Sequence, residues 1–177
     1  MTAYGVAQDP ASMPAKTSRY PVPMTHALLI EDDPEQMVLI QTNLQEFGQG
    51  RYRLDWASRL VDGLAHLGKA QFLGEFRVDV VLLDLGLPEC DGYDSYLAIR
   101  KKAPEVPVVV LTGDRREKTV EMVIRGGADG YLVKGEASGP QILAAMQSAI
   151  LRRTGRAASP DSVTFESGVW RRRRSAG

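Results

Sequence analysis

Residues 79–93 read DVVLLDLGLPECDGY, and this stretch decides the fold. Residues 78–83 are nearly all apolar, which is typical of a strand that is covered on both faces of a sheet. Asp84 follows this run directly. Such strands belong to parallel sheets that helices cover, so the stretch predicts an α/β fold.

The same pattern recurs on both sides of this stretch. Apolar runs at 27–30, 108–111 and 131–133 predict further buried strands. Residues 52–57 alternate between apolar and polar side chains, which is typical of an edge strand.

Helical patterns separate these runs. The clearest begins with Asp33 as N-cap and Pro34 in the first turn, and it ends at Gly48. Five strands that alternate with five helices predict a parallel sheet with helices on both faces. The other four helices are expected at about 58–68, 93–102, 116–126 and 139–153.

The predicted elements define one domain, at residues 25–153, between two segments without periodicity. Residues 1–24 are rich in Pro, Ala and Ser, so we expect a disordered leader, unless Met24 is the natural start. Residues 151–177 contain seven Arg and two acidic residues, and we expect a flexible basic tail at residues 154–177. Residues 25–150 contain 19 acidic and 13 basic residues, which makes nucleic-acid binding by this domain unlikely on electrostatic grounds.

The composition excludes several classes of protein. One cysteine cannot form a disulfide framework or a cysteine-based zinc site. With only two histidines, a histidine-rich metal site is not expected. The chain has no apolar run of 18 residues and no secretory signal pattern, so no membrane span and a cytoplasmic location are expected.

Polar residues stand at the ends of four predicted strands. Ligands bind at the carboxyl edge of open parallel sheets, where these residues are expected to meet. Several carboxylates in one small site repel each other unless a cation lies between them, and oxygen ligands suit Mg²⁺. Asp84, alone on a central strand, is the best candidate for a nucleophile in phosphoryl transfer. The residues at these strand ends are Glu31, Asp32, Asp33, Asp84, Thr112 and Lys134.

Four segments resemble the receiver domains of two-component response regulators. They occur in the family's order and at receiver-like spacing, and the resemblance covers about residues 26–153. It implies a flavodoxin-like doubly wound sheet of five parallel strands in the order 2-1-3-4-5. The segments are LLIEDD (28–33), DVVLLDLGLPECDGY (79–93), VPVVVLTGD (106–114) and GADGYLVKG (127–135).

The resemblance also implies a role for each matching residue. Asp84 would accept the phosphoryl group, and Glu31 and Asp32 would bind Mg²⁺ together with Asp84. Gly86 would offer its backbone carbonyl to the metal. Thr112 and Lys134 would contact the phosphoryl group, with Gly113 leaving room beside Thr112. Tyr131 would be the switch aromatic that turns inward as Thr112 moves.

By the same resemblance, the chain would take part in phosphorelay signalling. A histidine kinase or histidine phosphotransfer protein would donate the phosphoryl group to Asp84. The phosphorylated domain would then change a surface formed by residues 116–126, 131–133 and 139–153, which binds another protein or a second copy. The domain would catalyse its own phosphorylation and dephosphorylation without being a turnover enzyme.

Three departures from the family leave alternatives open. Gly135 replaces the proline that often follows the lysine, and residues 69–77 form a longer connection, expected to bulge away from the site. The 24 residues after the domain are too few for an output domain, so we expect a stand-alone receiver. The alternatives are the receiver part of a longer hybrid kinase or output-domain regulator and, less favoured, an aspartyl-phosphate phosphatase, whose second aspartate would stand where Gly86 is.

Overall fold

The computed structural model describes residues 24–73, 77–113, 117–155, 163–166 and 169–172. The expected leader therefore lies outside the described residues, apart from Met24, as does part of the expected tail. Strands and helices alternate from β1 to α5, and the bounds are β1 Thr25–Ile30, α1 Pro34–Phe47, β2 Tyr52–Ala57, α2 Leu60–Leu73, β3 Val80–Asp84, α3 Gly92–Lys102, β4 Val108–Thr112, α4 Glu117–Arg125, β5 Gly130–Val133 and α5 Gly139–Thr154.

The five strands form one parallel sheet in the order β2-β1-β3-β4-β5, which confirms the predicted order. All five residues of β3 and all five of β4 are buried, as their apolar sequences predict. Strand β2 lies at one edge and shows the mixed burial expected of an edge strand.

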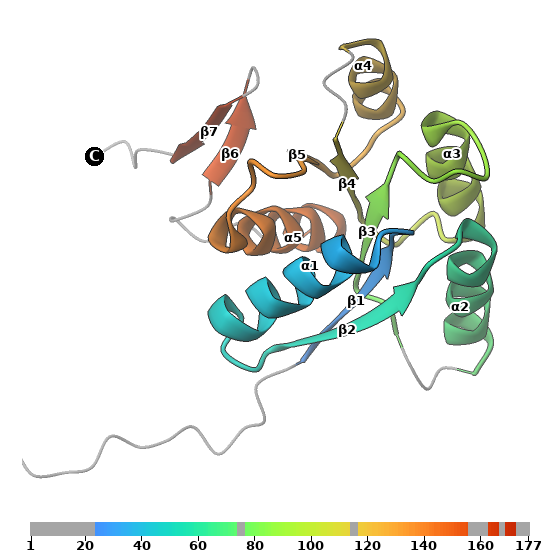
Figure 1. Cartoon of the computed structure of the whole chain (residues 1–177), viewed down its shortest axis with the longest axis horizontal. Coiled ribbons are helices and arrows are strands. Elements are labelled where there is room, and N and C mark those ends of the chain that lie inside the picture. Colours follow the sequence, from blue (N-terminus) through green and yellow to red (C-terminus); the bar gives the residue numbers. More distant parts are fainter. Residues whose placement is uncertain (1–23, 74–76, 114–116, 156–162, 167–168, 173–177) are drawn as a thin grey trace, which may run out of the picture.

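Helices cover both faces of the sheet (Figure 1). Alternate residues of β1 belong to two different hydrophobic clusters, because side chains of a strand point to opposite faces in turn. Ala27 and Leu29 pack with residues of α1 and α5, whereas Leu28 and Ile30 pack with residues of α2, α3 and α4. Each strand is therefore fixed from two sides, which holds its carboxyl end in place.

A partly buried cluster of polar groups joins the amino ends of β4 and β5 to helices α3 and α5. We call it the Arg100–Asp129 cluster; its members are Tyr96, Arg100, Val108, Asp129 and Arg153. The Asp129 carboxylate lies 2.6 Å from Arg100 Nη2 and 2.8 Å from Arg153 Nε, and it accepts a hydrogen bond of 3.0 Å from Val108 N. Arg100 Nε also donates to the Tyr96 hydroxyl at 2.9 Å. The cluster lies at the amino ends of the strands, whereas Asp84 and Thr112 lie at the carboxyl ends of β3 and β4.

Two parts of the chain differ from the sequence-based expectations. Helix α2 continues to Leu73, so residues 69–73 extend the helix instead of forming part of a bulge; Gln71 and Leu73 are good helix formers. Beyond α5, strands β6 Val163–Glu166 and β7 Val169–Arg172 pair antiparallel, although no secondary structure was expected there. Their valines and aromatic residues favour strands. No described helix combines the length and the apolar composition that a membrane span requires.

Candidate functional site

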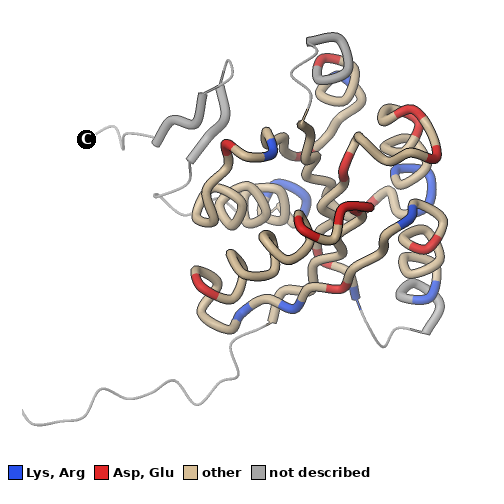
Figure 2. The backbone as a smooth tube through the Cα atoms, viewed as in Figure 1, with Lys and Arg blue, Asp and Glu red and all other residues tan. Residues whose placement is uncertain are grey.

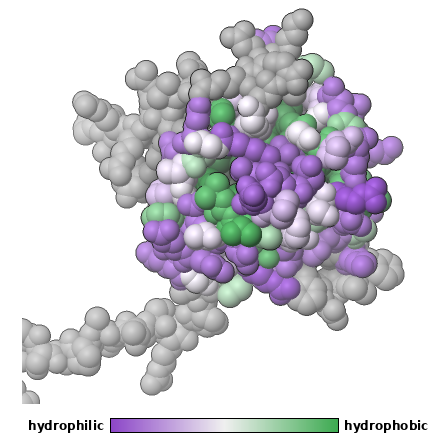
Figure 3. Space-filling view, in the orientation of Figure 1, coloured by the Kyte–Doolittle hydropathy of each residue, from purple (hydrophilic) through white to green (hydrophobic). Residues whose placement is uncertain are grey.

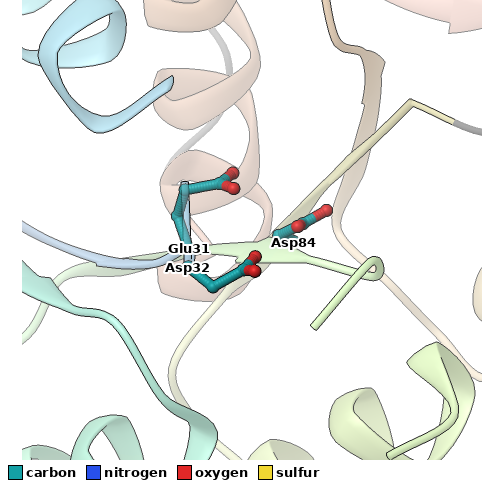
Figure 4. Close-up of side chains that lie close together, drawn as sticks. All are labelled: Glu31, Asp32 and Asp84. Atoms are coloured by element: carbon teal, nitrogen blue, oxygen red, sulfur yellow. The ribbon is translucent and has the colours of Figure 1, made fainter. Parts of the chain in front are cut away.

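Three carboxylates gather where β1 and β3 end. Glu31 follows β1 directly, Asp32 comes next, and Asp84 is the last residue of β3. One oxygen from each lies within 4.8 Å of the other two, and Figure 4 shows the three side chains around one space. Glu31 and Asp84 are buried, and Asp32 is exposed. The register of β1 with β3 brings these residues together, as the sequence analysis predicted.

Lys134 lies between two of these carboxylates. Its Nζ atom is 2.6 Å from Glu31 Oε2 and 2.8 Å from Asp84 Oδ2. It reaches this place because β5 ends at Val133, and the Lys134 N–H donates to the Thr112 carbonyl at 2.8 Å. One ammonium group therefore compensates part of the negative charge of three carboxylates.

The surroundings shift the pKa values of both partners in this contact. Burial raises the pKa of the Glu31 carboxyl; the Lys134 ammonium opposes this shift, and the nearby Asp84 charge adds to it. Burial alone would lower the pKa of Lys134, but hydrogen bonds and charges from Asp84 and Glu31 raise it above the usual lysine value. Lys134 is therefore a cation at neutral pH, whereas burial destabilises the ionised form of Glu31.

Gly86 lies directly beside the Asp84 carboxylate. Its N–H donates to Asp84 Oδ1 at 2.9 Å, which fixes the orientation of that carboxylate. A Cβ atom at position 86 would stand only 3.2 Å from Asp84 Oδ2, so a side chain there would crowd the site. The glycine keeps the approach to Asp84 open.

Thr112 and Tyr131 lie on the same face of the sheet. Tyr131 pairs with Val110, two residues before Thr112, and both Val110 and Tyr131 belong to the cluster that α2, α3 and α4 cover. Thr112 is buried and Tyr131 is half-buried. Apart from its chain neighbours, no described atom lies within 4 Å of the position that a Cβ of Gly113 would take.

The sequence analysis missed two contacts around the site. Trp56 is 43% exposed, and its Nε1 donates to the Glu31 carbonyl at 2.7 Å. Arg59 Nε lies 2.5 Å from Glu89 Oε1, which joins the loop before α2 to the loop after β3. Both contacts join residues 25 or more positions apart, and the position of Trp56 at the end of a predicted strand next to β1 was the available signal.

The donor set suits a hard divalent cation. Three carboxylates and one ammonium leave an excess of negative charge, and carboxylate oxygens at this spacing are ligands that Mg²⁺ accepts. Figure 2 shows acidic residues along the connection from β1 to α1, where two of these carboxylates lie. In Figure 3 this hydrophilic area borders hydrophobic side chains over α1, whose exposed members include Val38 and Leu39. The residues present therefore fit a magnesium ion.

The chain is similar to curated regulatory proteins. It is 33% identical over 144 residues to the transcriptional regulatory protein AfsQ1 of Streptomyces coelicolor, covering 81% of this chain and 58% of the relative. It is 38% identical over 133 residues to the transcriptional regulatory protein QseB of Escherichia coli O157:H7, covering 75% of this chain and 55% of the relative. The chain spans about half the length of the curated relatives that it matches.

The chain is also similar to solved structures of receiver domains. A response regulator receiver domain protein from Clostridium thermocellum matches with a TM-score of 0.63 and 25% identity, over 74% of this chain and 98% of that one. The receiver domain of the sensor histidine kinase PA1611 from Pseudomonas aeruginosa matches with a TM-score of 0.59 and 25% identity, over 72% and 98%. The latter structure has a magnesium ion coordinated in its active site cleft.

The family match covers most of the domain. The response regulator receiver domain family matches residues 27–147, which span the sheet from β1 to β5 and most of α5. Fold, strand order and sequence similarity agree with this match. The chain therefore belongs to the family of response regulator receiver domains of two-component systems.

Proposed function

We propose that Asp84 accepts a phosphoryl group from a phosphohistidine donor. The observation that carries this proposal is the position of Asp84: its buried carboxylate lies at the end of the central strand, 2.8 Å from Lys134 and within 4.8 Å of two further carboxylates. A carboxylate held beside a permanent cation, with an open approach at Gly86, suits attack on phosphorus.

The transfer exchanges one bond to phosphorus for another. A carboxylate oxygen of Asp84 forms a P–O bond, and the P–N bond of the phosphohistidine breaks. The imidazole nitrogen keeps the bonding electron pair and takes a proton from solvent. The product is an acyl phosphate on Asp84, which water later hydrolyses back to the carboxylate and inorganic phosphate. The domain supports both steps without acting as a turnover enzyme.

Glu31, Asp32 and Asp84 would hold Mg²⁺, together with the backbone carbonyl of Gly86. The ion, when bound, supplies positive charge to the phosphoryl oxygens on which negative charge is spread during transfer. Lys134 contributes a second cation, and its contacts with Glu31 and Asp84 keep that cation in the site beforehand. The three carboxylates, with their oxygen ligands and excess negative charge, support the assignment of this metal site.

Thr112 and Tyr131 would transmit the phosphorylated state. The Thr112 hydroxyl would move toward a phosphoryl oxygen, and Tyr131 would then turn into the space behind it. Their position on one face of the sheet supports this role. The outcome would be a changed surface of α4, β5 and α5, and only a partner that binds the two states differently can use that change.

A histidine kinase or histidine phosphotransfer protein would be the donor. The reader of the changed surface would be another protein, a second copy of this chain, or an output segment such as the longer regulators contain. We do not assign nucleic-acid binding to the domain itself, because the described site and the residues of the domain carry an excess of acidic groups.

Labelling with a small phosphodonor tests the proposal. Incubation with phosphoramidate, which has a P–N bond, and Mg²⁺ should add one phosphoryl group to the intact chain, as measured by mass spectrometry. Asp84→Asn should abolish this label, whereas Asp94→Asn, an exposed aspartate in the first turn of α3, should leave it unchanged. Equal labelling of Asp84→Asn and the parent would refute the assignment.

A further inference from the structure

Trp56 binds the backbone of the acidic loop that follows β1. Its Nε1 donates a hydrogen bond of 2.7 Å to the Glu31 carbonyl, and the Glu31 N–H donates to the Ala57 carbonyl at 3.1 Å. The carboxyl end of β2 therefore binds both backbone polar groups of Glu31. The first of these bonds comes from a side chain, on an edge strand.

The hydrogen bond from Trp56 continues where the sheet stops. The last paired residue of β1 is Ile30, which lies opposite Ala57 on one side and Leu83 on the other. The Glu31 carbonyl lies beyond these pairs, and a carbonyl in such a place needs another donor. Because the peptide bond is planar, fixing this carbonyl also fixes the N–H of Asp32 and the direction in which the chain continues.

The Asp32 carboxylate depends on this backbone for its position. It is exposed and, among the described residues, its side chain forms no hydrogen bond or ion pair, yet it lies within 4.8 Å of the other two carboxylates. The Glu31 side chain has Lys134 at 2.6 Å and accepts from Asp33 N at 3.3 Å. Asp32 therefore lacks the side-chain contacts that hold its neighbour.

The exposure of Trp56 argues against a packing role. Trp56 is 43% exposed, among the exposed large hydrophobic residues of the domain, yet its N–H donates to one specific carbonyl. We propose that Trp56 is a positioning residue for metal binding: its indole N–H fixes the Glu31–Asp32 peptide, so that the Asp32 carboxylate faces Asp84 before the metal arrives. This inference rests on the proposed function, because it concerns the same magnesium site.

Mg²⁺ affinity of the full chain tests this role. Trp56→Phe keeps an aromatic ring and removes the N–H donor, so the dissociation constant for Mg²⁺ should rise about two- to tenfold, the worth of one hydrogen bond. Isothermal titration calorimetry with MgCl₂ measures this change without relying on tryptophan fluorescence, which the substitution alters. At saturating Mg²⁺, the rate of labelling by phosphoramidate should return to that of the parent.

Tyr52→Phe is the matched control. Tyr52 begins the same strand, and its hydroxyl accepts a hydrogen bond of 2.8 Å from Gln147 at the end of β2 away from the site. This variant also loses one side-chain hydrogen bond from an aromatic residue, so it should match Trp56→Phe in thermal unfolding without Mg²⁺. Its Mg²⁺ affinity should equal that of the parent. A purely structural role of Trp56 would lower the midpoint of unfolding and leave the Mg²⁺ affinity unchanged.

The possible results separate this inference from the proposed function. Equal Mg²⁺ affinity of parent and Trp56→Phe would overturn the role of Trp56 while the labelling of Asp84 stands. A parent that neither binds Mg²⁺ nor accepts the label would overturn the proposed function itself. If Trp56→Phe does not fold, the parent still decides: its Trp56 indole proton should be protected from solvent exchange and its NMR signal should shift with Mg²⁺. Exchange at the rate of free tryptophan would overturn the inference.

Discussion

The Nζ atom of Lys134 lies 2.8 Å from Oδ2 of Asp84, so a cationic side chain directly contacts the candidate phosphoryl acceptor. The same ammonium lies 2.6 Å from Glu31 Oε2, and Glu31 is fully buried. The stability of the fold therefore depends on Lys134, because a buried carboxylate without a partner cation is strongly destabilising. The first prediction follows from this dependence.

Lys134→Met should destabilise the metal-free protein by about 3 kcal/mol, because it leaves buried carboxylates without their partner. Mg²⁺ should then stabilise the variant more than the parent, since the ion binds a site of greater negative charge. Thermal unfolding with EDTA and with MgCl₂ measures both effects. A variant as stable as the parent in EDTA would show that the contact contributes little. Lys101→Met, at an exposed position of α3, is the control.

Glu31→Gln should stabilise the metal-free protein at neutral pH. The Glu31 pKa is raised in the folded state, so the folded chain keeps a proton that the unfolded chain loses. The stability of the parent therefore falls as the pH rises from the ordinary glutamate pKa of about 4.3 through the raised value. The stability gained by the variant should grow across this window and stay constant above it.

Urea unfolding in EDTA at a series of pH values measures this gap. Glu46→Gln, at an exposed position near the end of α1, is the matched control. A gap between Glu31→Gln and the parent that does not change with pH would contradict the prediction.

Arg100→Met should reduce stability without affecting phosphorylation. Arg100 and Asp129 are largely buried, with side-chain exposures of 13% and 9%, so the loss should be about 2–3 kcal/mol. Breaking the exposed pair of Arg53 and Asp55 by Arg53→Met should cost less than about 1 kcal/mol. Urea unfolding and the labelling rate with phosphoramidate measure the two properties. If folded Arg100→Met is labelled more slowly than the parent, the cluster at the amino ends of the strands is coupled to the site at their carboxyl ends.

Thr112→Ala should accept the phosphoryl group but fail to transmit it. Beryllofluoride, which mimics the phosphoryl group, should shift the backbone amide NMR signals of residues 130–133 and of α4 in the parent. These shifts should be much smaller in Thr112→Ala and altered in Tyr131→Ala, because each lacks one part of the proposed switch. Thr42→Ala, at an exposed position of α1, should behave as the parent. Full shifts in Thr112→Ala would refute the switch while leaving the acceptor unaffected.

The sheet and its order could be predicted because buried parallel strands differ sharply from their surroundings. The apolar sequences of β3 and β4 are typical of strands in the interior of a sheet with helices on both faces, and both strands are fully buried. The end of α2 was harder to locate, because residues 69–73 have helix propensity without a clear apolar stripe. Pairing of β6 with β7 was missed because two strands of four residues give too short a pattern.

The residues of the site were predictable where they stand at strand ends. The parallel register brings Glu31, Asp84 and Lys134 to one edge, so their proximity follows from the topology. The Trp56 hydrogen bond does not follow from topology, because it depends on the rotamer of one side chain across 25 residues of sequence. Local periodicity contains no information on such a contact.

The Arg100–Asp129 cluster and the acidic site lie at opposite ends of the same sheet. Crowded carboxylates make a domain less stable, and the partly buried cluster at the other end of the sheet contributes stability from a place that does not contact them. The ion pairs of this cluster involve none of the three carboxylates, so a substitution in the acidic site leaves these contacts in place. In evolutionary terms, part of the demand of folding and the demands of the acidic site fall on different residues of one sheet.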